Sequence, residues 1–335
     1  MKRSIVVCVS LVAAVSLTAS EPVTPQATDR LNPVIALQEQ GLPVFGITHP
    51  PIVARQPGGR GRGGRGGGRG AAAGEATGTA GATVGAATPA PPIVLSDVAK
   101  ETVAYDRADF LYTSGTSETF LEYLKEIKKA GGSMRTHPFS AKIGIWHSNQ
   151  ERVNAAIVSQ LNAGHVNVSM EAVESAQEVR DVIKAMRLTS AGGTRPETGL
   201  ENAAAYWGLS VDHYKQKADV WPINKNGELM ISVIVESIEG VANVREIAAE
   251  PGVSQMFAGY GTLGQVFRDD PEGREKATAQ ILAACKEFNV PCGFPANNPA
   301  EMEQRMKEGW TVFIMQRRNE DGFGAVETGR KLGGR

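Results

Sequence analysis

Acidic side chains follow two apolar runs of this 335-residue chain at the point where each run stops. The β-branched run Met230–Val235 ends in Glu236, and the run Val166–Met170 ends in Glu171. Carboxylate oxygens are ligands that Mg²⁺ and Mn²⁺ prefer, so we predict a divalent-metal site with Glu236 and Glu171 as ligands. The alternative interpretation of a glutamate at such a position is a salt bridge to a neighbouring Lys or Arg.

Two histidines stand at comparable positions. His49 follows the apolar run 43–47, and His147 follows the run 142–146. Imidazole is the side chain that most often transfers protons near neutral pH, so we predict that His147 or His49 acts as the base of a catalytic site. Hydrogen-bonded loop residues without a chemical role are the alternative.

Gly259 and Gly261 follow another apolar run, Val253–Ala258, and Thr262 comes directly after them. Glycines at the end of a strand let the backbone approach a ligand closely, which predicts a substrate-binding role for Gly259, Gly261 and Thr262. A tight turn from strand to helix would need the same residue types.

Eight apolar runs alternate with segments of helical periodicity. The predicted strands span residues 43–47, 109–113, 142–146, 166–170, 230–235, 253–258, 291–295 and 310–316. Strict alternation predicts a parallel sheet, and eight repeats fit a (β/α)₈ TIM barrel, in which the carboxyl ends of the strands converge on one face. A doubly wound sheet is the second interpretation, but no G-x-G-x-x-G motif follows the first strand.

The chain divides by composition into four parts. Residues 1–20 have a basic start, an apolar core and small residues at their end, which predicts a signal peptide and a periplasmic or secreted protein. Residues 21–53 hold an N-terminal segment and the first strand, 54–92 form an insert, and 93–335 supply the remainder of the barrel. After removal of the signal, no stretch is apolar enough to cross a bilayer.

The insert is rich in Arg, Gly and Ala. This composition buries too little apolar surface to order itself, which predicts a disordered spacer. Arg-Gly runs also bind polyanions, so contact with an anionic surface is the alternative. The net charge of −1 argues against a protein that binds nucleic acid with its whole surface, and export argues against RNA, so no nucleic-acid partner is expected.

Cys285 and Cys292 are the cysteines left after the predicted signal. Free cysteines are commonly core residues, so we predict two buried thiols. A disulfide is the alternative if the compartment is oxidising.

Several motifs together resemble the HpcH/HpaI aldolase (citrate lyase-like) family of metal-dependent (β/α)₈ barrels. VESIEG at 235–240 is similar to the family's V-E-T-x-x-G, and FAGYGTL at 257–263 stands at its F-I-G-P-x-D-L. GLPVFG at 41–46, NAGHVN at 162–167 and VESAQE at 173–178 resemble its first strand, its fourth strand and the helix that follows. The resemblance runs from about Asn32 to Gly324, interrupted by the insert.

The resemblance implies roles for individual positions. Glu236 matches the family's metal-binding Glu, whereas Thr262 stands at the metal-binding Asp. Thr116 stands at the catalytic His, and Ile145, close to His147, stands at the substrate-binding Arg. Three of the four family roles therefore have a different residue type in this chain.

The resemblance implies a carbon–carbon lyase of the aldolase type that acts on a small 2-keto acid with Mg²⁺ or Mn²⁺, and it implies a homo-oligomer. His49, His147 and Glu171 could compensate for the replaced residues, because barrel sites are built from several strand ends. The alternative hypothesis is a barrel that has lost catalysis and binds a small anionic ligand or a partner.

Overall fold

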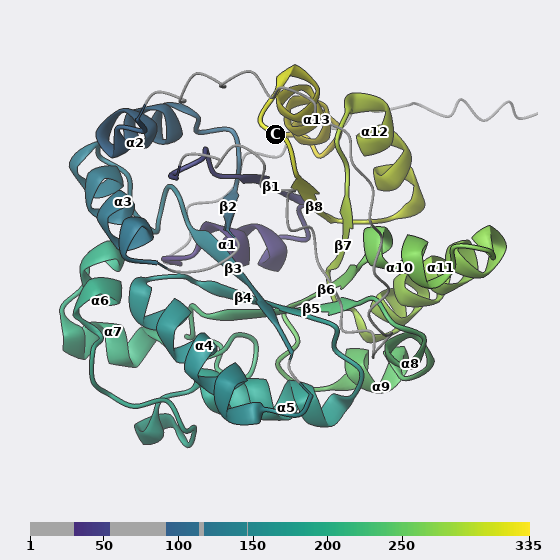
Figure 1. The fold of residues 1–335 in the computed structure, drawn as a ribbon, viewed down its shortest axis with the longest axis horizontal. Helices are drawn as coiled ribbons and strands as arrows, with labels where there is room; N and C mark the ends of the chain where they lie inside the picture. Colours follow the sequence, from purple (N-terminus) through teal and green to yellow (C-terminus); the bar gives the residue numbers. More distant parts are fainter. Residues whose placement is uncertain (1–29, 54–91, 114–116, 146) are drawn as a thin grey trace, which may run out of the picture.

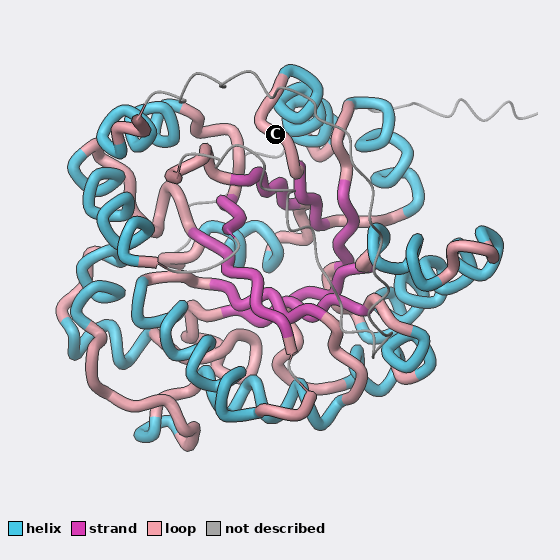
Figure 2. Tube along the Cα trace, viewed as in Figure 1, coloured by secondary structure: helices cyan, strands magenta, loops and turns pink. Residues whose placement is uncertain are grey.

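The computed structural model describes residues 30–53, 92–113, 117–145 and 147–335. In these ranges the chain forms a closed barrel of eight parallel strands in sequential order, with β1 paired to β8. Figures 1 and 2 show the strands around the centre and most helices in a ring outside them. The predicted (β/α)₈ barrel is confirmed. The predicted signal, and the insert except for Pro92, lie outside the described residues.

The strands are short and almost wholly buried, because helices cover the outside of the barrel and side chains fill its inside. The predicted strand 230–235 is confirmed to the residue as β5. The strands are β1 (Val44–Thr48), β2 (Phe110–Thr113), β3 (Phe139–Gly144), β4 (Asn167–Glu171), β5 (Met230–Val235), β6 (Gln255–Ala258), β7 (Cys292–Pro295) and β8 (Val312–Met315).

Most of the outer helices begin at a side chain that caps their first turn. Ser175 and Glu178 form a capping box before α5, and Asn298 with Pro299 starts α12. The outer helices are α2 (Leu95–Ala104), α3 (Glu118–Lys129), α4 (Gln150–Ala163), α5 (Ala176–Met186), α6 (Glu201–Trp207), α7 (Val211–Lys217), α8 (Ile238–Ala242), α9 (Val244–Ala249), α10 (Tyr260–Val266), α11 (Pro271–Phe288), α12 (Pro299–Glu308) and α13 (Glu320–Leu332).

Helix α1 (Pro33–Glu39) precedes the first strand and covers the amino end of the barrel. Its buried residues Val34, Ile35 and Leu37 belong to the same apolar cluster as Met230 and Phe257, which face the inside of the barrel. Figure 2 shows this helix behind the ring of strands. The barrel interior is therefore closed by apolar side chains at its amino end.

Most predicted strands are confirmed to within two residues at each bound, and the larger differences are these. Strand β3 begins at Phe139, three residues before the predicted start at Lys142. The helical segment expected between the fifth and sixth strands is two helices that meet at Asn243, whose side chain donates to the carbonyl of Glu174 at 2.8 Å. After β6 the chain enters α10 directly at Tyr260, so Gly261 and Thr262 lie in a helix and not in a separate loop.

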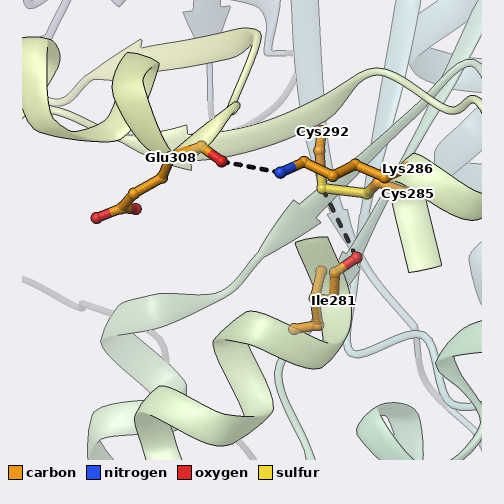
Figure 3. The surroundings of a disulfide bond; sticks show 5 residues. All are labelled: Ile281, Cys285, Lys286, Cys292 and Glu308. Atoms are coloured by element: carbon orange, nitrogen blue, oxygen red, sulfur yellow. Dashed lines mark hydrogen bonds between the residues drawn. A yellow bond between two sulfur atoms is a disulfide. The ribbon is translucent and has the colours of Figure 1, made fainter. Parts of the chain in front are cut away.

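Cys285 and Cys292 form a disulfide, so the prediction of two free thiols is wrong. Cys285 lies near the end of α11 and Cys292 opens β7, and this short connection brings their Cα atoms to 5.7 Å. Figure 3 shows the bond beside Lys286, which donates to the carbonyl of Glu308 at 2.9 Å. No helix in the described ranges is long and apolar enough to span a membrane.

Candidate functional site

Glu236 directly follows β5, at the carboxyl end of the barrel. Its side chain is half-buried and lies against Gly259, at the end of β6. A Cβ atom built on Gly259 would come within 2.4 Å of the Glu236 Cβ and 2.6 Å of its Oε2. The absence of a side chain at Gly259 therefore makes room for the Glu236 carboxylate.

Lys142 brings a positive charge to the same end of the barrel. It lies two residues beyond Ser140 on β3 and therefore points to the same, inward side of the strand. Its ammonium forms an ion pair with Glu171, at the end of β4, and is also attracted by Glu236. The strands that carry these residues, β3, β4 and β5, are neighbours in the barrel (Figure 1). We call Lys142, Glu171 and Glu236 the charged layer.

The charged layer is reached by solvent. The Lys142 side chain is 34% exposed and that of Glu171 is 28% exposed. Burial of the remainder lowers the pKa of Lys142, and the negative charge of Glu236 opposes this shift. A partly desolvated amine and two carboxylates thus meet at an accessible position.

Tyr112 on β2 and Ser169 on β4 stand beside the charged layer. Burial raises the pKa of the Tyr112 phenol, and the nearby charge of Glu236 raises it further, so this hydroxyl keeps its proton at neutral pH. Ser169 is buried and lies opposite Lys142 in the β3–β4 register. The site therefore also contains hydroxyl groups that can donate protons or hydrogen bonds.

A second set of polar side chains crosses the barrel one step closer to its amino end. Asn167 donates to the hydroxyls of Ser140 at 3.0 Å and Ser232 at 2.8 Å, and Ser232 donates to Gln255 at 2.8 Å. We call these four residues the neutral layer. They are at most 6% exposed, so this layer is a structural network inside the core rather than a binding surface.

His147 lies on the loop after β3 and is 45% exposed. Its Nδ1 atom bonds to the Glu178 carboxylate at 2.6 Å, and its Nε2 atom is 3.6 Å from Glu174. Among the described residues no contact joins His147 to Glu236 or Lys142. The structure therefore places this predicted base with the start of α5, at the rim of the site.

His49 points away from the barrel interior, because it is one residue beyond the inward-facing Thr48. Its ring packs among Phe120, Tyr123 and Phe139 between the barrel and α3, with Nδ1 bonded to the carbonyl of Pro50 at 2.6 Å. Burial lowers the pKa of this imidazole. These contacts give His49 a packing role and do not bring it to the charged layer.

Of the remaining predicted site residues, only one contacts the charged layer in the described part of the chain. Gly259 contacts Glu236 as described, whereas Gly261 and Thr262 lie in the first turn of α10, where Gly261 is exposed and Thr262 is half-buried. Thr116 lies outside the described residues. Of the predicted set, the structure brings together Glu171, Glu236 and Gly259.

The residues around Glu236 fit a divalent metal poorly. In the part of the chain that the structure describes, no three Asp, Glu, His or Cys side chains cluster to hold an ion. Glu171 is ion-paired with Lys142, which already supplies a positive charge beside both glutamates. Thr262 offers a hydroxyl where a carboxylate would be needed. The metal site stays a prediction that depends on the resemblance.

Lys142 is the site residue that sequence reasoning missed. The predicted strand began at Lys142, which would place this residue at the far, amino end of the barrel. A signal was present in Phe139-Ser140-Ala141, which follows Pro138, because Pro is tolerated at the start of a strand. Extending the strand back to this point moves Lys142 toward the carboxyl end.

Comparison with known proteins shows that residues 146–312 match the model of the HpcH/HpaI aldolase/citrate lyase family. This stretch contains Glu171, Glu236 and Gly259, but it begins after Lys142. The chain is 29% identical over 161 residues to the hydroxypyruvate/pyruvate aldolase of Paraburkholderia phytofirmans, which is 46% of this chain and 59% of that protein.

A 2-dehydro-3,6-dideoxy-6-sulfogluconate aldolase of Pseudomonas putida is 26% identical over 156 residues, 45% of this chain and 56% of that protein. The chain thus spans less than two thirds of the length of these relatives. An HpcH/HpaI aldolase from Desulfitobacterium hafniense has the same fold, with a TM-score of 0.56 at 14% identity over 88% of this chain and 93% of that one. A protein of the HpcH/HpaI aldolase/citrate lyase family from Burkholderia cenocepacia gives a TM-score of 0.55 at 22% identity, over 71% of this chain and 89% of that one.

Proposed function

Because the chain belongs to the HpcH/HpaI aldolase/citrate lyase family, we propose that it is a carbon–carbon lyase of the aldolase type acting on a small 2-keto acid. The observation that carries the proposal is the position of Glu236. It matches the family's V-E-T-x-x-G motif, stands at the carboxyl end of β5, and lies with Lys142 at an accessible end of the barrel. The relatives named as aldolases support the same class of reaction.

The charged layer can serve such a substrate through its own groups. The Lys142 ammonium attracts the oxygens of an anionic keto acid, and the protonated Tyr112 hydroxyl can donate to them. Glu236 is an acceptor for the proton that must leave when the bond next to the carbonyl breaks. In the family, a bound Mg²⁺ or Mn²⁺ supplies further charge stabilisation, but the residues around Glu236 do not fit such an ion.

Turnover tests the proposal directly. Full-length protein is incubated with pyruvate and a short hydroxyaldehyde, with and without Mg²⁺ or Mn²⁺, and product formation is followed by NMR. We expect condensation product from the wild type and from Glu239→Gln, an exposed position on α8, and little from Glu236→Gln. A wild type that is inactive under all these conditions contradicts the proposal.

The replaced family residues at Thr262 and Thr116 favour a second candidate, a barrel that binds a small anion without turning it over. Calorimetry with oxalate, an unreactive dianion, distinguishes the two. Binding of oxalate that depends on Lys142 in a protein without aldol turnover would support the binding function.

We also propose that the protein is exported and works in the periplasm or outside the cell, as a homo-oligomer. The Cys285–Cys292 disulfide supports an oxidising compartment, because such bonds rarely persist in the cytosol. Cell fractionation and light scattering of the purified protein test these points.

A further inference from the structure

Lys142 differs from the lysines on the outer helices. Lys100, Lys276 and Lys307 are 71–72% exposed and pair with acidic residues three or four positions away on the same helix. Lys142 instead lies on a barrel strand, points inward, and pairs across the strands with Glu171. Its position is therefore not that of a solubilising surface lysine.

Stability alone gives little reason for this pair. An ion pair whose members are about one third exposed contributes little to the free energy of unfolding, because solvent screens the attraction. The neutral layer already joins β3, β4, β5 and β6 by side-chain hydrogen bonds deeper in the barrel. A cation at the open end of the barrel, beside two carboxylates, is better explained by a role in the reaction than by a role in stability.

We propose that the Lys142 ε-amino group forms an imine with the carbonyl carbon of the 2-keto acid, and that Glu171 carries the proton. The inference rests on the function proposed above and deepens it by naming the group that binds the substrate covalently. Lysine amines are established nucleophiles toward carbonyl substrates, and Glu171 is in direct contact with this amine.

The step is balanced within the site. Glu171 takes one proton from the Lys142 ammonium, and the freed nitrogen lone pair forms a bond to the keto carbon. A proton moves from this nitrogen to the former carbonyl oxygen, which gives a carbinolamine. Glu171 then returns its proton to that hydroxyl, the carbon–oxygen bond breaks, and water leaves. The products are a protonated imine, one water molecule and an ionised Glu171.

The protonated imine makes the next step accessible without a metal. Its positive nitrogen receives the electron pair of the carbon–carbon bond that breaks, which gives an enamine and releases the aldehyde fragment. In the same cleavage step, the Glu236 carboxylate accepts the hydroxyl proton of the departing fragment. The poor fit of a divalent ion around Glu236 is consistent with an amine that performs the charge stabilisation.

Reductive trapping tests the proposal independently of turnover. Full-length protein is incubated with pyruvate and cyanoborohydride, digested, and analysed by mass spectrometry. We expect a peptide carrying Lys142 whose mass has increased by pyruvate, less one oxygen. Lys142→Arg keeps the positive charge and a partner for Glu171 but cannot form the imine, so its trapping should fall to the background. Lys276→Met, on the exposed face of α11, should be trapped like the wild type.

The outcomes separate this inference from the proposed function. A trapped Lys142 supports the imine, whether or not aldol turnover is found. Turnover that survives chelation by EDTA in the wild type and falls to the level without enzyme in Lys142→Arg supports it further. Metal-dependent turnover without a trapped Lys142 overturns the imine and leaves the aldolase function standing. Adducts spread over exposed lysines, equal in wild type and Lys142→Arg, also overturn it.

Discussion

The charged layer and the neutral layer share strands β3, β4 and β5 of one barrel and differ in nearly every physical property. The charged layer holds Lys142, Glu171 and Glu236, and the side chains of Lys142 and Glu171 are about one third exposed. The neutral layer has no ionised group, is at most 6% exposed, and its members bond to one another. A short distance along β3, β4 and β5 thus separates polar groups that hold the barrel together from polar groups that are available to a substrate.

The largest expected effect is on turnover, in Glu236→Gln. The substitution keeps the shape of the side chain and removes the carboxylate that accepts the proton, so we expect kcat to fall by roughly 10²–10⁴-fold. Its thermal unfolding should match that of the wild type. A Glu236→Gln protein with wild-type kcat would show that Glu236 is not catalytic.

Asn167→Leu should have the opposite effect to Glu236→Gln: it should lower stability and leave turnover largely unchanged. It removes the central member of the neutral layer and leaves the buried hydroxyls of Ser140 and Ser232 without a donor. We expect the free energy of unfolding to fall by about 2–3 kcal/mol, measured by urea denaturation, with kcat largely unchanged at a temperature where the protein stays folded. Loss of kcat without loss of stability would erase the distinction between the layers.

Gly259→Ala tests the contact between backbone and charged layer. The new methyl group would overlap the Glu236 carboxylate, so that side chain must move. We expect a loss of about 1–2 kcal/mol in stability together with reduced kcat. The matched control is Gly261→Ala, where an added Cβ meets no described atom within 4 Å and both quantities should be close to wild type.

The smallest expected change is the stability of Lys142→Met. The ion pair with Glu171 is partly solvated, so its loss should alter the free energy of unfolding by no more than about 1 kcal/mol. Urea denaturation of this variant beside Asn167→Leu compares the two layers on one scale. A loss as large as that of Asn167→Leu would mean that Lys142 is a structural residue.

The barrel could be predicted from sequence because its signals are local and repeated. An unbroken apolar run such as Met230–Val235 identifies a buried strand, and a capping pair such as Ser175 and Glu178 identifies the start of a helix. Glu236 was accessible to the same reasoning, because it directly follows such a run. What each of these residues contacts is set by the closing of the barrel.

The rest of the site depends on register. The three-residue error in the start of β3 placed Lys142 at the wrong end of its strand, and the alternation of side chains along a strand decided that His49 faces α3 instead of the substrate. The pairing of Lys142 with Glu171 joins two strands, and no spacing within either one reveals it. Salt bridges had been named as the alternative for these glutamates, and for Glu171 the structure shows one.

Helix α1 has a consequence for kinetics. Its apolar side chains close the amino end of the barrel, so we expect substrate and products to use the carboxyl end alone. If the keto-acid fragment stays attached at Lys142, the aldehyde fragment leaves first and the keto acid last. In the cleavage reaction, the keto acid should then inhibit competitively with respect to the substrate. The aldehyde should inhibit noncompetitively. The opposite pattern would show that the aldehyde is the fragment held deeper in the barrel.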